Sequence, residues 1–141
     1  MVSKQVPELV RWRDRPRPEV IRGISSDHLA QVEGLIVALV ELDPGAEVPP
    51  HHHEHHDEVF DVMEGEGEVW LGGGWRPLRR GEVVVVPAGR VHALRNPGPG
   101  PLRLRETIHQ RVYLRAALRA AIRKRLPRWL RQRGQNGARA E

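Results

Sequence analysis

The sequence predicts an all-β sandwich or barrel followed by a basic α-helix. Between residues 34 and 108, short apolar or alternating segments are separated by turns rich in glycine and proline. Turns that recur about every eight to twelve residues are typical of β-sandwiches and barrels. After residue 108 the apolar residues recur every fourth position, which is a helical spacing. A chain of 141 residues has the length of one domain with one core.

The first predicted elements are an arm and a strand. Residues 1–24 mix charges with prolines and are interpreted as an N-terminal arm that holds one short strand near 19–24. Residues 34–42 are almost all apolar and partly β-branched, which predicts a strand. The sequence Asp43-Pro44-Gly45 supplies the turn that ends it.

The middle of the chain predicts the remaining strands. Residues 58–64 mix valine, phenylalanine and methionine with acids, a pattern that suits a strand, and residues 68–71 form the return strand between two glycine turns. Four valines in succession, Val83–Val86, predict a fully buried strand. The last predicted strands are 91–95 and 102–108.

The C-terminal part predicts an amphipathic basic helix over residues 111–133 and a disordered tail over 134–141. Its apolar stripe is expected to pack on the barrel or on a second subunit, with arginines facing water. A basic face can also lie on an anionic membrane surface or hold phosphates. No helix-turn-helix or aromatic stacking pattern is present, so no specific nucleic-acid partner and no membrane partner is expected. The stripe consists of Leu114, Leu118, Ile122 and Leu126.

Composition narrows the class of protein. The absence of cysteine excludes disulfides, thiolate metal sites and thiol nucleophiles. No apolar run approaches the ~20 residues that a membrane-spanning helix needs. The N-terminal residues are charged and contain prolines, unlike a secretory signal, so a cytoplasmic location is expected. Residues 111–141 carry ten basic residues against one acid, so the high pI is a property of the tail.

Four residues are candidate metal ligands. His51 and His53 are two positions apart, so on a strand both side chains leave the same face. Glu58 follows after a short interval, and His92 arrives from a second predicted strand. Three imidazoles and one carboxylate suit a divalent first-row transition metal such as Fe, Mn, Ni, Cu or Zn.

The histidine tract at 51–56 has two other interpretations. Five histidines in six residues can bind metal loosely at a surface. His51, Glu54 and His55 also match an inverted zinc-protease pattern, but that pattern requires a helix, and Pro49-Pro50 disfavour one here. His52, His55 and His56 are expected at the rim of the site or facing solvent.

The two segments resemble the signature motifs of the cupin superfamily, G(X)5HXH(X)3-4E(X)6G and G(X)5PXG(X)2H(X)3N. Every fixed position is matched, from Gly45 to Gly65 and from Gly81 to Asn96. The resemblance implies a cupin jelly-roll barrel over about residues 25–110. It also implies one metal ion held by His51, His53, Glu58 and His92, with open coordination positions.

Substrate-pocket residues are harder to predict. Phe60, Trp70 and Leu94 share strand parity with pocket-facing positions, and Val62 is a further candidate for an apolar lining. Glu106 is a candidate for contact with the substrate or with a ligand, as is Arg90. Glu58 is a possible proton acceptor if it loosens from the metal.

The resemblance implies a small metal-dependent enzyme acting on a small organic molecule. Dioxygenase-like oxidoreductase chemistry is favoured over isomerase or lyase chemistry, although the ligand set does not fix the reaction. The alternative is a non-catalytic, metal-bearing protein that binds or senses a small molecule. A homodimer is expected, because the arm and the apolar stripe both need a surface to bury and an open sheet edge is costly.

Overall fold

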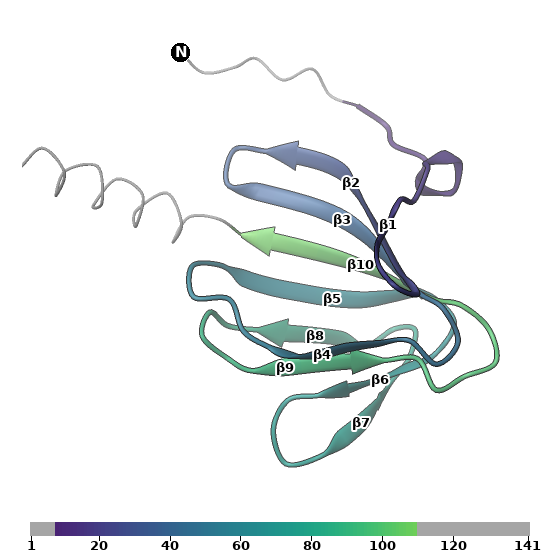
Figure 1. The fold of residues 1–141 in the computed structure, drawn as a ribbon. Coiled ribbons are helices and arrows are strands. Elements are labelled where there is room, and N and C mark those ends of the chain that lie inside the picture. The colour runs from purple at the N-terminus through teal and green to yellow at the C-terminus, as the bar shows by residue number, and fades with distance from the viewer. Residues whose placement is uncertain (1–7, 110–141) are drawn as a thin grey trace, which may run out of the picture.

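The computed structural model describes residues 8–109, which form a jelly roll of two antiparallel sheets (Figure 1). The larger sheet has the strand order β1-β2-β3-β10-β5-β8, and the smaller has the order β4-β9-β6-β7. The elements are η1 (Trp12–Asp14), β1 (Glu19–Ile21), β2 (Ile24–Val32), β3 (Leu35–Leu42), β4 (Glu47–His51), β5 (Asp57–Glu64), β6 (Gly67–Trp70), β7 (Trp75–Leu78), β8 (Val83–Val86), β9 (His92–Arg95) and β10 (Leu102–His109).

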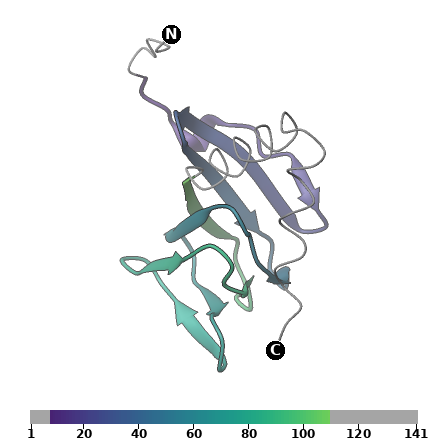
Figure 2. The same cartoon turned by 90° about the vertical axis from the view of Figure 1, so that its left-hand side faces the viewer.

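This architecture confirms the predicted all-β jelly-roll class. Strands β1–β3, purple to blue, and strands β6 and β7, teal, lie at opposite ends of the molecule (Figures 1 and 2). The predicted basic helix at 111–133 lies outside the described residues. Residues 8–109 contain no helix with the length and hydropathy that a membrane crossing requires.

The core lies between the two sheets, where every second side chain of the strands points inward. On β10, Leu102 and Leu104 are completely buried, whereas Arg103 between them faces outward and pairs with acids. The larger sheet contributes Leu42, Phe60, Leu102 and Leu104 to one apolar cluster, and the smaller sheet contributes Val69, Leu78 and Leu94.

Two sequence-based expectations about strands differ from the structure. The prediction that Val83–Val86 is fully buried is wrong, since Val83 and Val85 are 60% and 62% exposed. Strand β8 is an edge strand of the larger sheet, so only Val84 and Val86 face the core. Strand β2 was not expected, because only Ile24 among its residues is buried and a register shift at 28–30 interrupts the alternation.

A tight turn explains the glycine that closes the first motif. Gly65, which closes that motif, has a φ of +81°, and a Cβ there would lie 2.4 Å from the carbonyl oxygen of Pro101. Glycine is required because other residues would suffer both backbone strain and this clash. The turn returns the chain from β5 in the larger sheet to β6 in the smaller.

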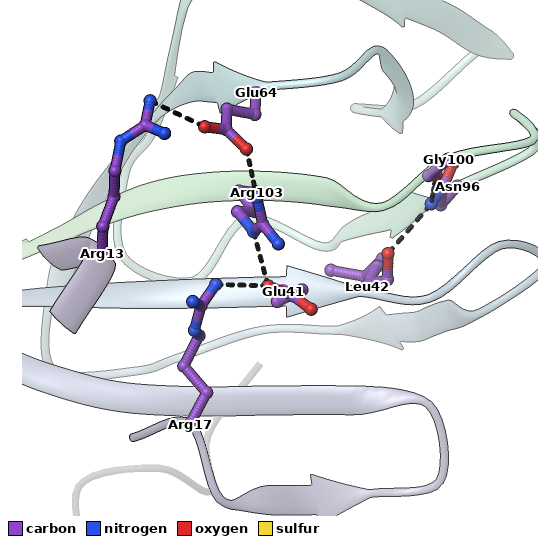
Figure 3. A network of polar contacts seen from close by, with 8 residues as sticks. All are labelled: Arg13, Arg17, Glu41, Leu42, Glu64, Asn96, Gly100 and Arg103. Atoms are coloured by element: carbon purple, nitrogen blue, oxygen red, sulfur yellow. Dashed lines mark hydrogen bonds and ion pairs between the residues drawn. The ribbon is translucent and has the colours of Figure 1, made fainter. Parts of the chain in front are cut away.

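A ladder of alternating charges ties the N-terminal arm to the outside of the larger sheet (Figure 3). Arg103 of β10 contacts Glu41 of β3 on one side and Glu64 of β5 on the other. Arg17 pairs with Glu41 at 2.5 Å, and Arg13 pairs with Glu64 at 2.8 Å. The arm therefore joins three neighbouring strands through their outward-facing side chains.

Asn96, the last residue of the second motif, links three segments from a buried position. Its amide nitrogen donates to the carbonyl oxygens of Leu42, at 2.9 Å, and Gly100, at 2.8 Å (Figure 3). Its amide oxygen accepts a hydrogen bond from the backbone nitrogen of Gly98 at 3.1 Å. Asparagine supplies donors and an acceptor in one short side chain, which explains this residue type here.

We predict that Asn96→Ala lowers the free energy of unfolding by about 2–3 kcal/mol. The substitution removes one buried hydrogen bond, to Leu42, and two partly buried ones, to Gly98 and Gly100. Denaturant unfolding measures the change. Glu47→Ala, at an exposed position of β4, is the matched control and should shift stability by less than about 0.5 kcal/mol. Equal stability of Asn96→Ala and wild type would contradict the structural role of the amide.

A second prediction concerns Glu41. Burial opposes its ionisation, but Arg103 and Arg17 outweigh burial and lower the pKa of Glu41 below its ordinary 4.5. A depressed folded-state pKa stabilises the fold above the unfolded value, and this stabilisation is lost as the pH falls through the folded-state pKa. Glu41→Gln should therefore cost about 1 kcal/mol at neutral pH, and the cost should shrink well below pH 4.5. Denaturant unfolding at several pH values tests this, and a cost independent of pH would refute it.

Candidate metal centre

The four candidate ligands come from three strands and one loop. His51 is the last residue of β4, His53 lies in the loop that follows, Glu58 is near the start of β5, and His92 begins β9. His51 and His92 are paired across the β4–β9 ladder. The fold therefore brings the two sequence motifs together at one end of the barrel.

The site has a buried floor and a partly exposed mouth. Glu58 and His92 are almost wholly buried, whereas the side chain of His53 is 33% exposed. One carboxylate oxygen of Glu58, Oε1, lies 2.9 Å from Nε2 of His53. The other, Oε2, lies 3.1 Å from Nε2 of His92. The ring of His51 lies beside that of His92, with centroids 4.3 Å apart.

Backbone carbonyls orient two of the imidazoles. His51 donates from Nδ1 to the carbonyl oxygen of Pro49 at 2.8 Å, and His92 donates from Nδ1 to that of Arg90 at 3.0 Å. A carbonyl only accepts, so Nδ1 carries the proton and Nε2 of each ring is free to ligate. Metal-binding histidines commonly use the second nitrogen in this way, which fixes the ring and its tautomer.

Two buried polar atoms in the floor of the site lack hydrogen-bond partners. Glu58 Oε2 and His92 Nε2 face each other, yet neither has a hydrogen-bond partner of good geometry among the described residues. Because the proton of a neutral His92 is on Nδ1, its Nε2 and the Oε2 of Glu58 direct lone pairs toward each other. Buried lone pairs at this distance need a proton or a cation between them. One nitrogen and one oxygen ligand atom therefore meet where a metal ion fits. The nitrogens of His51, His53 and His92 also lie within 4.8 Å of one another.

The charges of the site are interdependent. Burial opposes ionisation of Glu58, but the histidines outweigh it and lower the pKa of this carboxyl. Burial likewise opposes protonation of His92, but the contact with Glu58 prevails and raises its pKa. For His53, burial prevails over the attraction of Glu58 and lowers the pKa. A neutral His53 beside an ionised Glu58 is in the protonation state that ligation requires.

Glu106 adds a second carboxyl to the interior. It belongs to the inward-facing side of β10, two residues beyond Leu104, and is paired with Phe60 of β5. Burial, followed by the negative charge of Glu58, raises the pKa of Glu106 to about 8. At neutral pH this carboxyl is therefore mostly protonated and can donate a hydrogen bond.

The apolar residues proposed for a substrate pocket fall into two groups. Phe60, Val62 and Leu94 are buried in the core cluster, and the ring of Phe60 lies 6.0 Å from that of His92. The expectation that Trp70 shares their face is wrong. Val69 fills the core position on β6 beside Leu94, which leaves Trp70 on the opposite face. A substrate-lining role for any of them remains a prediction.

A cavity of about 490 Å³ is lined in part by the segment that precedes His92. None of the four candidate ligands lines it, so it is separate from the centre described above. Two side chains singled out from the sequence, Trp70 and Arg90, do line it. The full lining is Trp70, Leu71, Gly72, Val85, Val86, Pro87, Gly89, Arg90 and Val91.

The loops of the two motifs are joined by backbone and side-chain hydrogen bonds. The backbone nitrogen of Gly89 donates to the carbonyl oxygen of His53 at 2.7 Å. The nitrogen of Ala88 donates to the carboxylate of Asp57 at 2.9 Å. Gly89 has a φ of +81°, which favours glycine in the second motif. The position of His53 thus depends on the turn that precedes His92.

Sequence reasoning placed His56 at the rim, and its side chain is 22% exposed. The structure nevertheless brings its Nε2 to 3.2 Å from Oε1 of Glu58. His53, His56 and Glu58 form a second group whose ligand atoms lie within 4.8 Å of one another. The spacing of His56 and Glu58, two residues apart at the start of a strand, was the available signal for this contact.

Known proteins with similar sequences include enzymes and binding proteins. The quercetin 2,3-dioxygenase of Bacillus subtilis is 37% identical over 107 residues, which cover 66% of this chain and 32% of that one. The oxalate-binding protein of Thermotoga maritima is 32% identical over 63 residues, which cover 45% of this chain and 52% of that one. This chain thus matches about a third of the dioxygenase and half of the oxalate-binding protein.

Solved structures agree on the fold. The structure of KdgF from Halomonas superposes with a TM-score of 0.66 at 29% identity, covering 74% of this chain and 96% of that chain. The family model of the cupin domain matches residues 38–108, which include both motifs, from Gly45 to Asn96. The jelly roll, the two motifs and this match agree, and the chain belongs to the cupin domain family.

Proposed function

We propose that this protein is a metal-dependent enzyme that acts on a small organic molecule, with oxygenase-type chemistry. His51, His53, Glu58 and His92 hold one divalent transition metal ion. The observation that carries the proposal is the pair of buried atoms, Glu58 Oε2 and His92 Nε2, that lack hydrogen-bond partners in the described structure. Buried ligand atoms without partners are costly unless a cation binds between them.

The site residues support ligand binding from one side. His92 and Glu58 close the floor, while His53 borders solvent. A metal ion bound there supplies Lewis acidity or a route for electrons to a small molecule at its open positions. The ring of Phe60, a core residue, lies 6.0 Å from the His92 ring, so an apolar side chain borders the polar floor.

Two carboxyls beside the bound molecule can accept or donate a proton or a hydrogen bond. Glu58 is ionised and can accept a proton on the oxygen that it frees from the metal. Burial and the charge of Glu58 raise the pKa of Glu106 to about 8, and in its protonated form this carboxyl can donate a hydrogen bond to Glu58. This arrangement pairs a base with a neutral acid at the floor of the site.

The two relatives favour different function classes. The dioxygenase of Bacillus subtilis favours oxygen chemistry, although this chain covers only 32% of it. The oxalate-binding protein of Thermotoga maritima favours the alternative, a non-catalytic barrel that binds a small molecule. The apolar side chains of Phe60, Val62 and Leu94 favour an apolar or aromatic substrate over a sugar, because sugar sites need several inward hydrogen-bonding groups.

We predict that purified protein retains about one divalent metal ion per chain, as one ligand set of this kind holds one ion. His92→Ala should retain much less after dialysis against a weak chelator, because it removes the buried nitrogen. Elemental analysis of both proteins tests this. His52→Ala, whose side chain is 49% exposed and 3.9 Å from Glu54, is the control and should match wild type. Equal metal content in His92→Ala and wild type would refute the ligand assignment.

We also predict oxygen consumption with a suitable substrate. Metal-free protein reconstituted with Fe(II), Mn(II), Cu(II) or Ni(II) is offered a panel of phenols, diketones and alkenes while an electrode records dissolved oxygen. At least one combination should consume oxygen at a rate that His92→Ala reduces about a hundredfold or more. No uptake by any combination, together with tight retention of an unchanged small molecule, would favour the binding protein instead.

A further inference from the structure

We infer that His56 is a fifth metal-binding side chain, and that His53, His56 and Glu58 form a second ligand set overlapping the motif set. This inference rests on the proposed metal site and concerns a residue outside both sequence motifs. His53 and Glu58 belong to both sets, so one ion occupies one set or the other. The ion can therefore remain bound when His51 or His92 does not contact it.

The contacts around Glu58 divide between its two oxygens. Oε2 faces His92 at 3.1 Å, whereas Oε1 faces both His53 at 2.9 Å and His56 at 3.2 Å. The rings of His53 and His56 are stacked, with centroids 4.4 Å apart and planes inclined by 27°. Both rings therefore direct Nε2 to the same oxygen from the same side.

The second set has the chemistry of a metal site. Its three ligand atoms lie within 4.8 Å of one another, as do the nitrogens of His51, His53 and His92. Two imidazoles and one carboxylate are sufficient to hold zinc or iron in other proteins. A hydrogen bond from His56 to Glu58 satisfies the same atoms when no metal is present, so the arrangement costs little in the metal-free protein.

The second set also lies nearer the surface. The side chains of His53 and His56 are 33% and 22% exposed, whereas those of Glu58 and His92 are 2% and 0% exposed. An ion entering from solvent meets His53 and His56 before it reaches the nitrogen of His92. The set can therefore hold the ion during entry, and it can still bind the ion, with weakened affinity, when His51 or His92 is lost.

The test measures Co(II) binding to metal-free protein by calorimetry, with the visible spectrum of the bound ion as a second readout. The proteins are wild type, His51→Ala, His51→Ala/His56→Ala and His51→Ala/His56→Gln. His51→Ala/His52→Ala is the matched control, because His52 contacts Glu54 at 3.9 Å and belongs to neither set. Glutamine at position 56 can still donate a hydrogen bond to Glu58 but has no ligand nitrogen, so it separates ligation from support of the carboxylate.

We expect His51→Ala to bind Co(II) with weakened but measurable affinity. Loss of His56 in that background should weaken binding at least about tenfold further, by either alanine or glutamine, and alter the visible spectrum. The His52 control should match His51→Ala. Equal affinity of His51→Ala and His51→Ala/His56→Ala, or rescue by glutamine, would overturn the inference, as would two ions per wild-type chain. Failure of wild type to bind Co(II) would instead overturn the proposed metal site.

Discussion

A carboxylate buried in a protein interior needs a positive charge beside it. The site around Glu58 must therefore supply that charge. Taking an ionised carboxylate out of water costs several kcal/mol even after the protein relaxes. Three imidazoles lie within 3.2 Å of its oxygens, so their protons or a shared metal ion can balance the charge. For the second carboxyl nearby, Glu106, burial and then the negative charge of Glu58 raise the pKa to about 8. Burial and the charge of Glu58 together therefore shift the pKa values of His53, His92 and Glu106.

The sheets hold that arrangement in place. Strand β5 lies between β10 and β8, which pair with both of its edges, so Glu58 is fixed opposite Ile108 on one side and Val86 on the other. The same register sets Phe60 opposite Glu106 and Val84. Strand pairing between β4 and β9 fixes His51 opposite His92. The centre therefore needs no long loops to position its floor, and only His53 and His56 depend on the loop between β4 and β5.

Much of this could be predicted from the sequence, for a physical reason. Turn glycines, the alternation of residues 58–64 and the two motifs are local signals, and the cupin fold follows from them. The features that the sequence did not predict depend on residues that are distant in the chain. Whether Val83 and Val85 are buried depends on whether a second layer covers the outer face of β8, and four identical residues carry no such information. The face of Trp70 depends on the pairing of Val69 with Leu94. The proximity of His56 to Glu58 depends on how the loop before β5 folds back.

The hydrogen bond from Gly89 to His53 has a consequence for how such a barrel diversifies. A substitution in the turn at 87–89 replaces no candidate ligand, yet it shifts the Gly89 backbone nitrogen that donates to the carbonyl oxygen of His53. It also shifts the start of the strand that carries His92. Ligand geometry can thus change through substitutions outside the four candidate ligands. Because Pro87 and Gly89 also line the 490 Å³ cavity, a substitution that reshapes the cavity at this turn also displaces the groups that position His53 and His92. The shape of the cavity and the geometry of the candidate ligands are therefore coupled through one short turn.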